Sequence, residues 1–281
     1  MRDVDVSIIE NKLREACMAI AVEYSHDIIC ALRKGEQEET REKSKAALRM
    51  LLENAEIASR EQIAICQDTG MAIVWVKAGQ EVHFTGGSLI DAINRGVAAG
   101  YHDGYLRASV VDDPLFDRKN TKTNTPAVVY CDIVPGDEVE VEVMAKGFGS
   151  ENKSKTKMLT PADGVEGVKK FVLDAIKEAG PNACPPMVVG VGVGGTFDSC
   201  AVMAKKALLR PISQSNPDER YKQLEDELLE EANQLNVGPM GLHGRTTALK
   251  IQVEYFPTHI AGLPCAVNIC CHVCRHARMV I

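Results

Sequence analysis

The chain has 281 residues, of which 45% are hydrophobic and 25% are charged, an ordinary globular composition with ample material for a buried core. Its net charge of −7 and isoelectric point near 5.6 disfavour general binding to nucleic acid or to anionic membranes, because both need a basic surface. No apolar run reaches the roughly 20 residues of a membrane span, and the acidic start of the chain lacks the apolar core of a secretory signal. We therefore expect a soluble, cytoplasmic protein.

The first 60 residues are expected to be helical. Apolar residues recur at helical spacing between residues 5 and 34, and Gly35 is expected to break this pattern. A second helical stripe runs from about residue 39 to residue 58.

Strand and helix patterns alternate over the remainder of the chain. The segments 63–79 and 82–87 resemble strands flanking a turn at 68–70, and a helix at about 88–99 precedes a polar loop at 112–126. The elements expected after that loop are two strands within 127–143, a loop at 146–157, a helix at 161–179, a strand at 187–193, helices at 198–209 and ending near 235, and strands at about 247–255 and 264–270. We expect a mixed α/β fold in a single domain over 1–281, with a helical N-terminal part (1–60) and an α/β core (61–281).

Ten cysteines are the unusual feature of the composition. In a long chain without an export signal they are expected to be reduced, so each is a buried small side chain, a nucleophile or a metal ligand. Two cysteines in the helical region and one in a strand pattern resemble packing residues: Cys17, Cys30 and Cys131. Three others stand between expected elements, where ligands and catalytic groups tend to lie: Cys66, Cys184 and Cys271.

Two kinds of metal centre are compatible with these cysteines. Cys271 and Cys274 have the spacing of a zinc knuckle, but a structural zinc site needs four ligands and the chain has no second such pair. Three cysteines from distant loops would suit a [4Fe–4S] cluster in which one iron stays open as a Lewis acid. Spacing alone does not decide between them.

A glycine pattern at 190–195 matches G-x-G-x-x-G, follows an apolar strand and precedes a helix. A dinucleotide site also needs a second strand ending in an acidic residue about 20 positions later, and none is expected there. A closely packed strand–helix turn explains these glycines better.

Several segments match a known family in order: I-C-Q-D-T-G at 65–70, L-R-A-S-V-V at 106–111, R-K-N-T at 118–121 with N-T-P at 124–126, K-G-F-G-S-E-N at 146–152, A-C-P-P at 183–186 with G-G-T at 194–196, and P-T-H-I-A-G-L-P at 257–264 with C-H-V-C-R-H at 271–276. Together they resemble the α subunit of the class I (iron–sulfur) fumarate hydratases and of the related tartrate dehydratases. The chain departs from the family pattern at Phe148 and His243, where the family usually has Gly.

The resemblance implies a hydro-lyase that catalyses the reversible hydration of fumarate to L-malate on a [4Fe–4S] cluster. It implies Cys66, Cys184 and Cys271 as cluster ligands. It further implies catalytic and substrate-binding residues, which are Asp68, His259, Gln67, Arg107 and Gly149. The chain ends soon after the third cysteine, so a separate β subunit is expected to complete the site in a hetero-oligomer.

The chemistry of hydration agrees with these residue types. An open iron can hold the substrate hydroxyl, and the planar fork of Arg107 can hold a carboxylate of a small dicarboxylate. Asp68 and His259 are candidates for proton transfer, although an Asp before Thr-Gly is also a common turn residue. Two alternatives stay open: an L-tartrate dehydratase α subunit, and a zinc or iron–sulfur structural module without catalysis.

Overall fold

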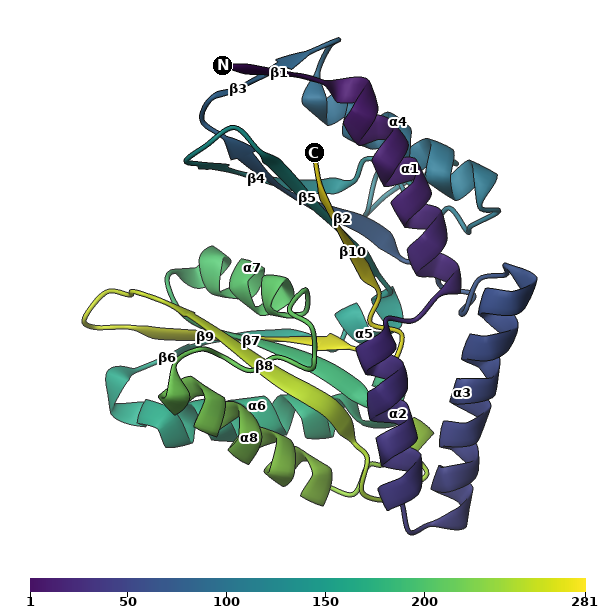
Figure 1. Ribbon diagram of the computed structural model, residues 1–281. Coiled ribbons are helices and arrows are strands. Elements are labelled where there is room, and N and C mark those ends of the chain that lie inside the picture. Colours follow the sequence, from purple (N-terminus) through teal and green to yellow (C-terminus); the bar gives the residue numbers. More distant parts are fainter. The chain divides into compact units, whose positions relative to one another are not determined.

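The computed structural model describes residues 1–281 and shows two compact units, each assembled from separate stretches of chain (Figure 1). Unit 1 comprises residues 1–23, 55–148 and 275–281, and unit 2 comprises residues 24–54 and 149–274. The mixed α/β class is confirmed. That residues 1–281 behave as one domain stays a prediction.

Unit 1 contains a four-stranded sheet, a small two-stranded sheet and two long helices. Its elements are β1 (Arg2–Asp5), α1 (Val6–Val22), β2 (Met71–Gly79), β3 (Val82–Thr85), α4 (Leu89–Asp103), β4 (Val128–Val134), β5 (Val139–Lys146) and β10 (His276–Val280). The larger sheet has the order β10-β5-β2-β4, in which β2 and β4 are parallel and the other pairs are antiparallel. The small sheet pairs β1 with β3 in parallel.

Helices α1 and α4 pack against each other and against the larger sheet of unit 1 (Figure 1). Ile9 and Leu13 of α1 and Ile93 of α4 are fully buried in this core. Full burial of such a side chain stabilises the fold by about 1.5–3 kcal/mol. At Gly96 and Gly100 the two helices approach so closely that an added Cβ would lie 2.5 and 2.8 Å from a backbone oxygen of α1.

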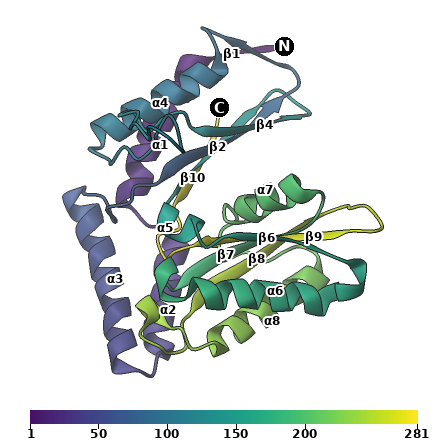
Figure 2. The ribbon, with the colours of Figure 1, turned by 180° about the vertical axis from the view of Figure 1, so that it is seen from behind.

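Unit 2 is a four-stranded sheet with helices on both faces. Its elements are α2 (His26–Glu38), α3 (Glu42–Glu61, of which residues 55–61 belong to unit 1), α5 (Phe148–Glu151, of which Phe148 belongs to unit 1), β6 (Lys155–Leu159), α6 (Gly164–Ala179), β7 (Met187–Gly194), α7 (Phe197–Ala207), α8 (Glu219–Gln234), β8 (Ala248–Phe256) and β9 (Leu263–Cys270), with short 3-10 turns at Pro161–Asp163, Gly180–Ala183 and Pro239–Gly241. The strand order is β6-β9-β7-β8, with β7 and β8 parallel and the other pairs antiparallel. Helices α6 and α8 cover one face and α7 covers the other (Figure 2).

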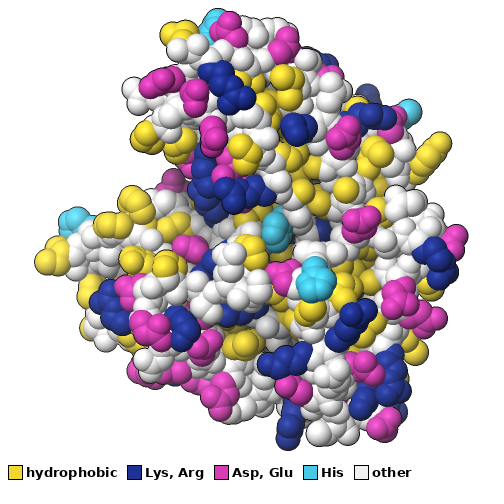
Figure 3. All heavy atoms as spheres, viewed as in Figure 1, with side chains coloured by type: hydrophobic (Ala, Val, Ile, Leu, Met, Phe, Trp, Pro, Cys, Tyr) yellow, Lys and Arg dark blue, Asp and Glu magenta, His cyan; other side chains and the backbone are white.

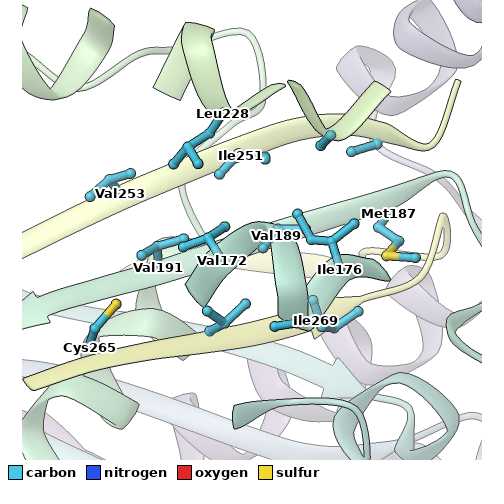
Figure 4. Packing of buried hydrophobic residues seen from close by; sticks show 14 of the residues in the cluster. Val172, Ile176, Met187, Val189, Val191, Leu228, Ile251, Val253, Cys265 and Ile269 are labelled. Atoms are coloured by element: carbon cyan, nitrogen blue, oxygen red, sulfur yellow. The ribbon is translucent and has the colours of Figure 1, made fainter. Parts of the chain in front are cut away.

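The main core of unit 2 lies between the sheet and helices α6 and α8 (Figure 4). Val189 and Val191 of β7 contribute to it with Val172 and Ile176 of α6 and Leu228 of α8, and all five are fully buried. Alternate residues of a strand point to opposite faces, so β7 presents Val189, Val191 and Val193 to this core and Gly190 and Gly192 to α7.

The glycines of the G-x-G-x-x-G pattern serve this packing against α7. A Cβ added to Gly190 would lie 1.9 Å from the carbonyl oxygen of Ala204, and one added to Gly192 would lie 2.1 Å from that of Cys200. Only glycine lets the backbone of α7 approach the strand this closely.

Two expectations for individual segments are wrong. Gly35 does not break a helix: α2 continues through it to Glu38, and a Cβ at Gly35 would make a tight contact of 3.0 Å with a methyl group of Thr246. Residues 63–66 are not a strand either. They form an irregular segment between α3 and β2, where the backbone N–H of Ile65 donates to the carbonyl of Ala21 (2.9 Å).

Three further strands were not expected. β1 precedes the first helix, in the part of the chain that was expected to be helical. β6 begins at Lys155, within the segment expected to be a loop, and continues to Leu159. β6 is an edge strand that pairs only with β9, and its outer side is polar. Its sequence therefore has the pattern of a loop. The Cys/His/Arg-rich tail contains β10, which pairs antiparallel with β5.

The surface shown in Figure 3 carries acidic and basic side chains close together, including those over α8 of unit 2. Lys169 of α6 pairs with Glu227 and Glu231 of α8 at 3.2 and 2.5 Å. None of the helices combines the length and the apolar character that crossing a membrane requires.

The contact between β7 and α7 allows a test of the fold. We expect Gly190→Ala to lower the free energy of unfolding by about 3 kcal/mol or more, because the new methyl group overlaps the backbone of α7. Gly262→Ala is the matched control, since an added Cβ there meets no atom closer than 3.8 Å. Urea denaturation of both variants measures the effect, and equal midpoints would contradict the close packing.

Candidate functional site

In unit 1, the segment from Cys66 to Gly70 is held by buried groups that bind its backbone. The Tyr101 hydroxyl lies 2.8 Å from the carbonyl oxygen of Thr69 and 2.9 Å from that of Gly70, so it donates to this pair. Gly70 has a φ of +81°, and a Cβ there would lie 2.8 Å from the backbone of Ala145. The turn therefore requires glycine, and it leaves the Cys66 side chain half-buried at the edge of the unit.

The Asp68 carboxylate is fixed by two backbone amides of unit 1. One oxygen accepts a hydrogen bond from the N–H of Gly70 (3.0 Å) and the other accepts one from the N–H of Phe148 (2.8 Å). Neither bond uses a side-chain cation, and Asp68 remains half-buried. Its orientation is thus set while it keeps lone pairs that can accept a proton.

Arg107 is tied to the same segment through its backbone. The Thr69 hydroxyl donates to the carbonyl oxygen of Arg107 (3.0 Å), while the Arg107 side chain is exposed. Four of the expected site residues therefore come together in unit 1: Cys66, Gln67, Asp68 and Arg107.

The Asn-rich loop after residue 112 supports this arrangement. Asn124 is fully buried; its side-chain oxygen accepts from the N–H of Ser109 (2.8 Å) and its nitrogen donates to the carbonyl of Gly70 (3.1 Å). Asn120 donates to the carbonyl of Ala108 (2.9 Å). The motifs at 65–70, 106–111 and 118–126 thus form one hydrogen-bonded assembly.

In unit 2, Cys184 and Cys271 lie at the same end of the sheet. Cys184 is exposed, has a left-handed backbone (φ 51°), and precedes β7, whereas Cys271 is half-buried and follows β9. The two strands are antiparallel, with Val188 opposite Cys270. The N–H of His272 lies 3.5 Å from the carbonyl oxygen of Cys184, which holds the two segments together.

His272 is itself a buried, anchored residue. Its Nδ1 lies 2.7 Å from the hydroxyl of Tyr24. Residues next to a metal ligand commonly orient it through hydrogen bonds, and His272 directly follows Cys271.

The remaining seven cysteines are less suited to bind a cluster. Five of them are buried: Cys17, Cys200, Cys265, Cys270 and Cys274. Burial raises the pKa of the Cys17 and Cys265 thiols to about 12, which disfavours the thiolate that a metal requires. Cys30 and Cys131 are exposed, but they lie within α2 and the edge strand β4, away from the segments described above.

The accessible thiols have the chemistry of iron–sulfur ligands. No group of three or more His, Cys, Asp or Glu side chains is placed to hold one metal ion. In a [4Fe–4S] cubane each cysteine binds a different iron, so its ligands need not converge on one point. The accessible thiols of Cys66, Cys184 and Cys271, all in irregular segments, match that requirement.

Gly149 lies in α5, which is fixed within unit 2. Glu151 at the end of this helix pairs with Lys205 of α7, and it accepts from Asn268 of β9 (3.1 Å). Gly149 itself is exposed, and nothing lies within 4 Å of where its Cβ would be. Its backbone is therefore open to a ligand.

His259 lies elsewhere in unit 2. It is exposed in the loop between β8 and β9, at the far end of β9 from Cys271. The eight residues of β9, at about 3.3 Å each, separate the two ends by roughly 26 Å. The hairpin carrying His259 projects beyond α7 in both ribbon views (Figures 1 and 2). Within one chain, the structure does not bring His259 to Cys184 and Cys271.

The surroundings of His259 are mainly apolar. It lines a cavity of about 530 Å³ together with Val165, Leu224 and Leu263. The Gly194-Gly195-Thr196 segment also lies at this end, since the Thr258 hydroxyl donates to the carbonyl of Gly195 (2.8 Å). The resemblance associated that segment with the second cluster cysteine, but β7 separates it from Cys184.

Sequence reasoning missed Tyr101 as a residue that holds the Cys66 segment, whereas Asn124 and Arg275 lay within family motifs but their contacts to this segment were not foreseen. Arg275 is 4% exposed and donates to the carbonyl oxygen of Asp68. The available signal was the pair of Asn-containing motifs, whose side chains bind the backbone of the L-R-A-S segment. Tyr101 gave no signal, because it falls on the apolar stripe of α4 and looks like a core residue.

Comparisons with known proteins agree with this arrangement of motifs. The profile of the Fumarate hydratase (Fumerase) family matches residues 10–280. A putative L(+)-tartrate dehydratase subunit alpha of Methanocaldococcus jannaschii is 41% identical over 263 residues, which cover 92% of each chain. The L(+)-tartrate dehydratase subunit alpha of Escherichia coli is 33% identical over 267 residues, 93% of this chain and 87% of that one. That of Shigella sonnei is 32% identical over the same shares of the two chains. The chain therefore belongs to the fumarate hydratase (Fumerase) family of hydro-lyases.

Proposed function

We propose that this chain is the α subunit of a [4Fe–4S]-dependent hydro-lyase that interconverts fumarate and L-malate. The observation that carries the proposal is the family match over residues 10–280, because it includes all three accessible inter-element cysteines. The chain passes between its two units four times, after residues 23, 54, 148 and 274, and each unit supplies cysteines of the proposed set. We therefore treat residues 1–281 as one functional domain.

Cys66, Cys184 and Cys271 would hold the cluster. When bound through three cysteines, a [4Fe–4S] cluster supplies a Lewis acid for the substrate hydroxyl. The backbone contacts of Ile65 and Thr69, on either side of Cys66, and those of Cys184 would hold these two ligands in advance, which lowers the ordering cost of binding.

The side chains of unit 1 would bind and orient the dicarboxylate. The exposed guanidinium of Arg107 can take one carboxylate through two parallel hydrogen bonds. Gln67, exposed beside Cys66, and the open backbone at Gly149 would line the pocket. Asp68, held by two amides, would accept or return the proton that hydration moves to or from the substrate carbon.

A partner subunit is part of the proposal. The substrate has two carboxylates, and Arg107 can bind only one of them with full geometry. The relatives that this chain resembles are named subunit alpha. We propose a β subunit that supplies the second cationic clamp, giving a hetero-oligomer.

L(+)-tartrate is the second candidate substrate. The observation that favours it is the name of the similar chains, which are tartrate dehydratase subunits. Tartrate has the carbon skeleton of malate with one more hydroxyl group, so the same clamp and the same Lewis acid would serve. A site that hydrogen-bonds the extra hydroxyl would discriminate strongly between the two acids.

The ligand assignment can be tested by iron and acid-labile sulfide content after anaerobic reconstitution. Single Cys→Ser changes at positions 66, 184 and 271 are expected to abolish the cluster, because each removes one thiolate ligand. Cys30→Ser and Cys131→Ser are the controls, since both thiols are exposed but lie outside the set. A full cluster in any of the three ligand variants would remove that cysteine from the site.

The subunit proposal predicts that cluster-loaded α chain alone hydrates fumarate only in trace amounts, because a substrate clamp is missing. Adding β should restore turnover. Loss of fumarate absorbance and formation of oxaloacetate from L(+)-tartrate should be followed in parallel, and the larger kcat/KM identifies the substrate. Full turnover by α alone would refute the two-subunit proposal.

His259 gives a sharper prediction. Because β9 separates it from Cys271 within one chain, it can serve the proposed site only from a second copy of this chain. His259→Asn and Cys271→Ser chains, each inactive with β, should then complement when mixed. Random pairing into two-fold dimers would recover about a quarter of wild-type activity, since half of the dimers carry one intact site. Full activity of His259→Asn alone would exclude His259 from catalysis.

A further inference from the structure

Arg275 of unit 1 is a buried cation that forms no ion pair. Arg275 is only 4% exposed. Its Nη2 donates to the carbonyl oxygen of Asp68, its Nε lies 3.4 Å from the carbonyl oxygen of Ala145, and its buried Nη1 has no hydrogen-bond partner. All of its contacts are therefore with neutral carbonyl groups.

Such an arrangement is unfavourable unless an anion is supplied. Transfer of a charge out of water is offset only by an opposite charge and by hydrogen bonds to every donor. Arg210 of unit 2 shows the usual solution, because its partly buried guanidinium pairs with Glu225 and with Glu254. Arg275 has no corresponding carboxylate.

The carboxylate of Asp68 forms no ion pair with Arg275. It accepts from the backbone N–H groups of Gly70 and Phe148, and the bond between the two residues runs from the guanidinium to the Asp68 carbonyl oxygen. Arg275 and Tyr101 bind the carbonyl groups of two consecutive residues, Asp68 and Thr69, so the guanidinium and the hydroxyl support the same stretch of backbone. The uncompensated charge is thus directed at the segment that begins with Cys66.

We infer that Arg275 is a positioning residue whose charge compensates the anionic [4Fe–4S] centre bound through Cys66 and whose fork fixes the backbone of Asp68. This inference rests on the proposed function. A cubane in its usual oxidised state with three thiolate ligands carries one net negative charge, and reduction by one electron adds a second. A nearby buried cation stabilises both forms, and the reduced form more strongly.

The test compares three variants of the full α chain after anaerobic reconstitution. Arg275→Gln removes the charge, and Arg275→Lys keeps the charge but loses the fork. Arg278→Gln is the matched control. Arg278 lies three residues further on in β10, its side chain is 62% exposed, and it pairs with Glu140. The readouts are the reduction midpoint potential of the cluster, followed by its spectroscopic signal, and the rate of iron loss to a chelator.

For Arg275→Gln we expect the oxidised-to-reduced ratio of the cluster to rise at least tenfold. This corresponds to a midpoint potential lowered by about 59 mV for one electron. Iron loss should be about 10- to 100-fold faster. Arg275→Lys should keep the potential within that tenfold limit, and Arg278→Gln should match the wild type in both readouts.

Several outcomes would overturn the inference. An Arg275→Gln cluster with wild-type potential and stability would show that the charge does not act on it. A higher KM in the complex with β, at unchanged potential, would assign Arg275 to a substrate carboxylate instead. If Arg275→Gln does not fold, a shift beyond the tenfold limit in Arg275→Lys would exclude charge compensation. Failure of the wild-type chain to take up iron would reject the proposed function itself, which is a distinct result.

Discussion

Three consecutive carbonyl groups, those of Asp68, Thr69 and Gly70, are each bound by a buried side chain, and the candidate site of unit 1 depends on these bonds. An unpaired buried carbonyl is costly, so the donors Arg275, Tyr101 and Asn124 set the path of this segment. With the carbonyls turned inward, the side chains of Cys66 and Asp68 are left at the accessible side. The position of the functional groups is thus a consequence of backbone hydrogen bonding in an irregular segment.

Unit 2 places its functional groups by a different principle. Its sheet is fully buried along β7, and Cys184 and Cys271 lie just before this strand and just after its antiparallel neighbour β9. This brings residues 184 and 271 together although they are distant in sequence. The same antiparallel pairing carries the loop with His259 to the opposite end. One sheet therefore defines two separate functional regions, of which only one contains cysteine ligands.

The fold class and most elements could be predicted because they follow from periodicity. The alternation in β5 and the apolar run of β7 were sufficient to identify both strands. Gly35 was wrongly expected to break a helix. Its small size fits a close contact with Thr246, and sequence alone does not reveal that contact. Ile65 was misinterpreted for a similar reason, since it is buried without belonging to a sheet.

The candidate site was predicted in part, from resemblance to family motifs and not from periodicity. The resemblance identified the expected ligands and substrate-binding residues, but it did not identify the hydrogen bonds that support them. Tyr101 lies on a helix stripe and Arg275 in a charged tail, so neither pattern indicates a buried hydrogen bond to the backbone. Local sequence does not encode which distant carbonyl a side chain will meet. That information exists only once β10 is paired with β5.

The placement of β10 also has a consequence for the order in which the chain is made. Residues 275–281 complete the sheet of unit 1, yet they are synthesised after every residue of unit 2. During translation, the larger sheet of unit 1 therefore stays incomplete until the whole of unit 2 has emerged from the ribosome. Until then, the edge of β5 that pairs with β10 is uncovered. A chain released early at any point before residue 275 lacks both the closing strand and the donor to Asp68. Such a product would hold the Cys66 segment through only two of its three buried donors, Tyr101 and Asn124, so full support of the candidate site depends on completion of synthesis.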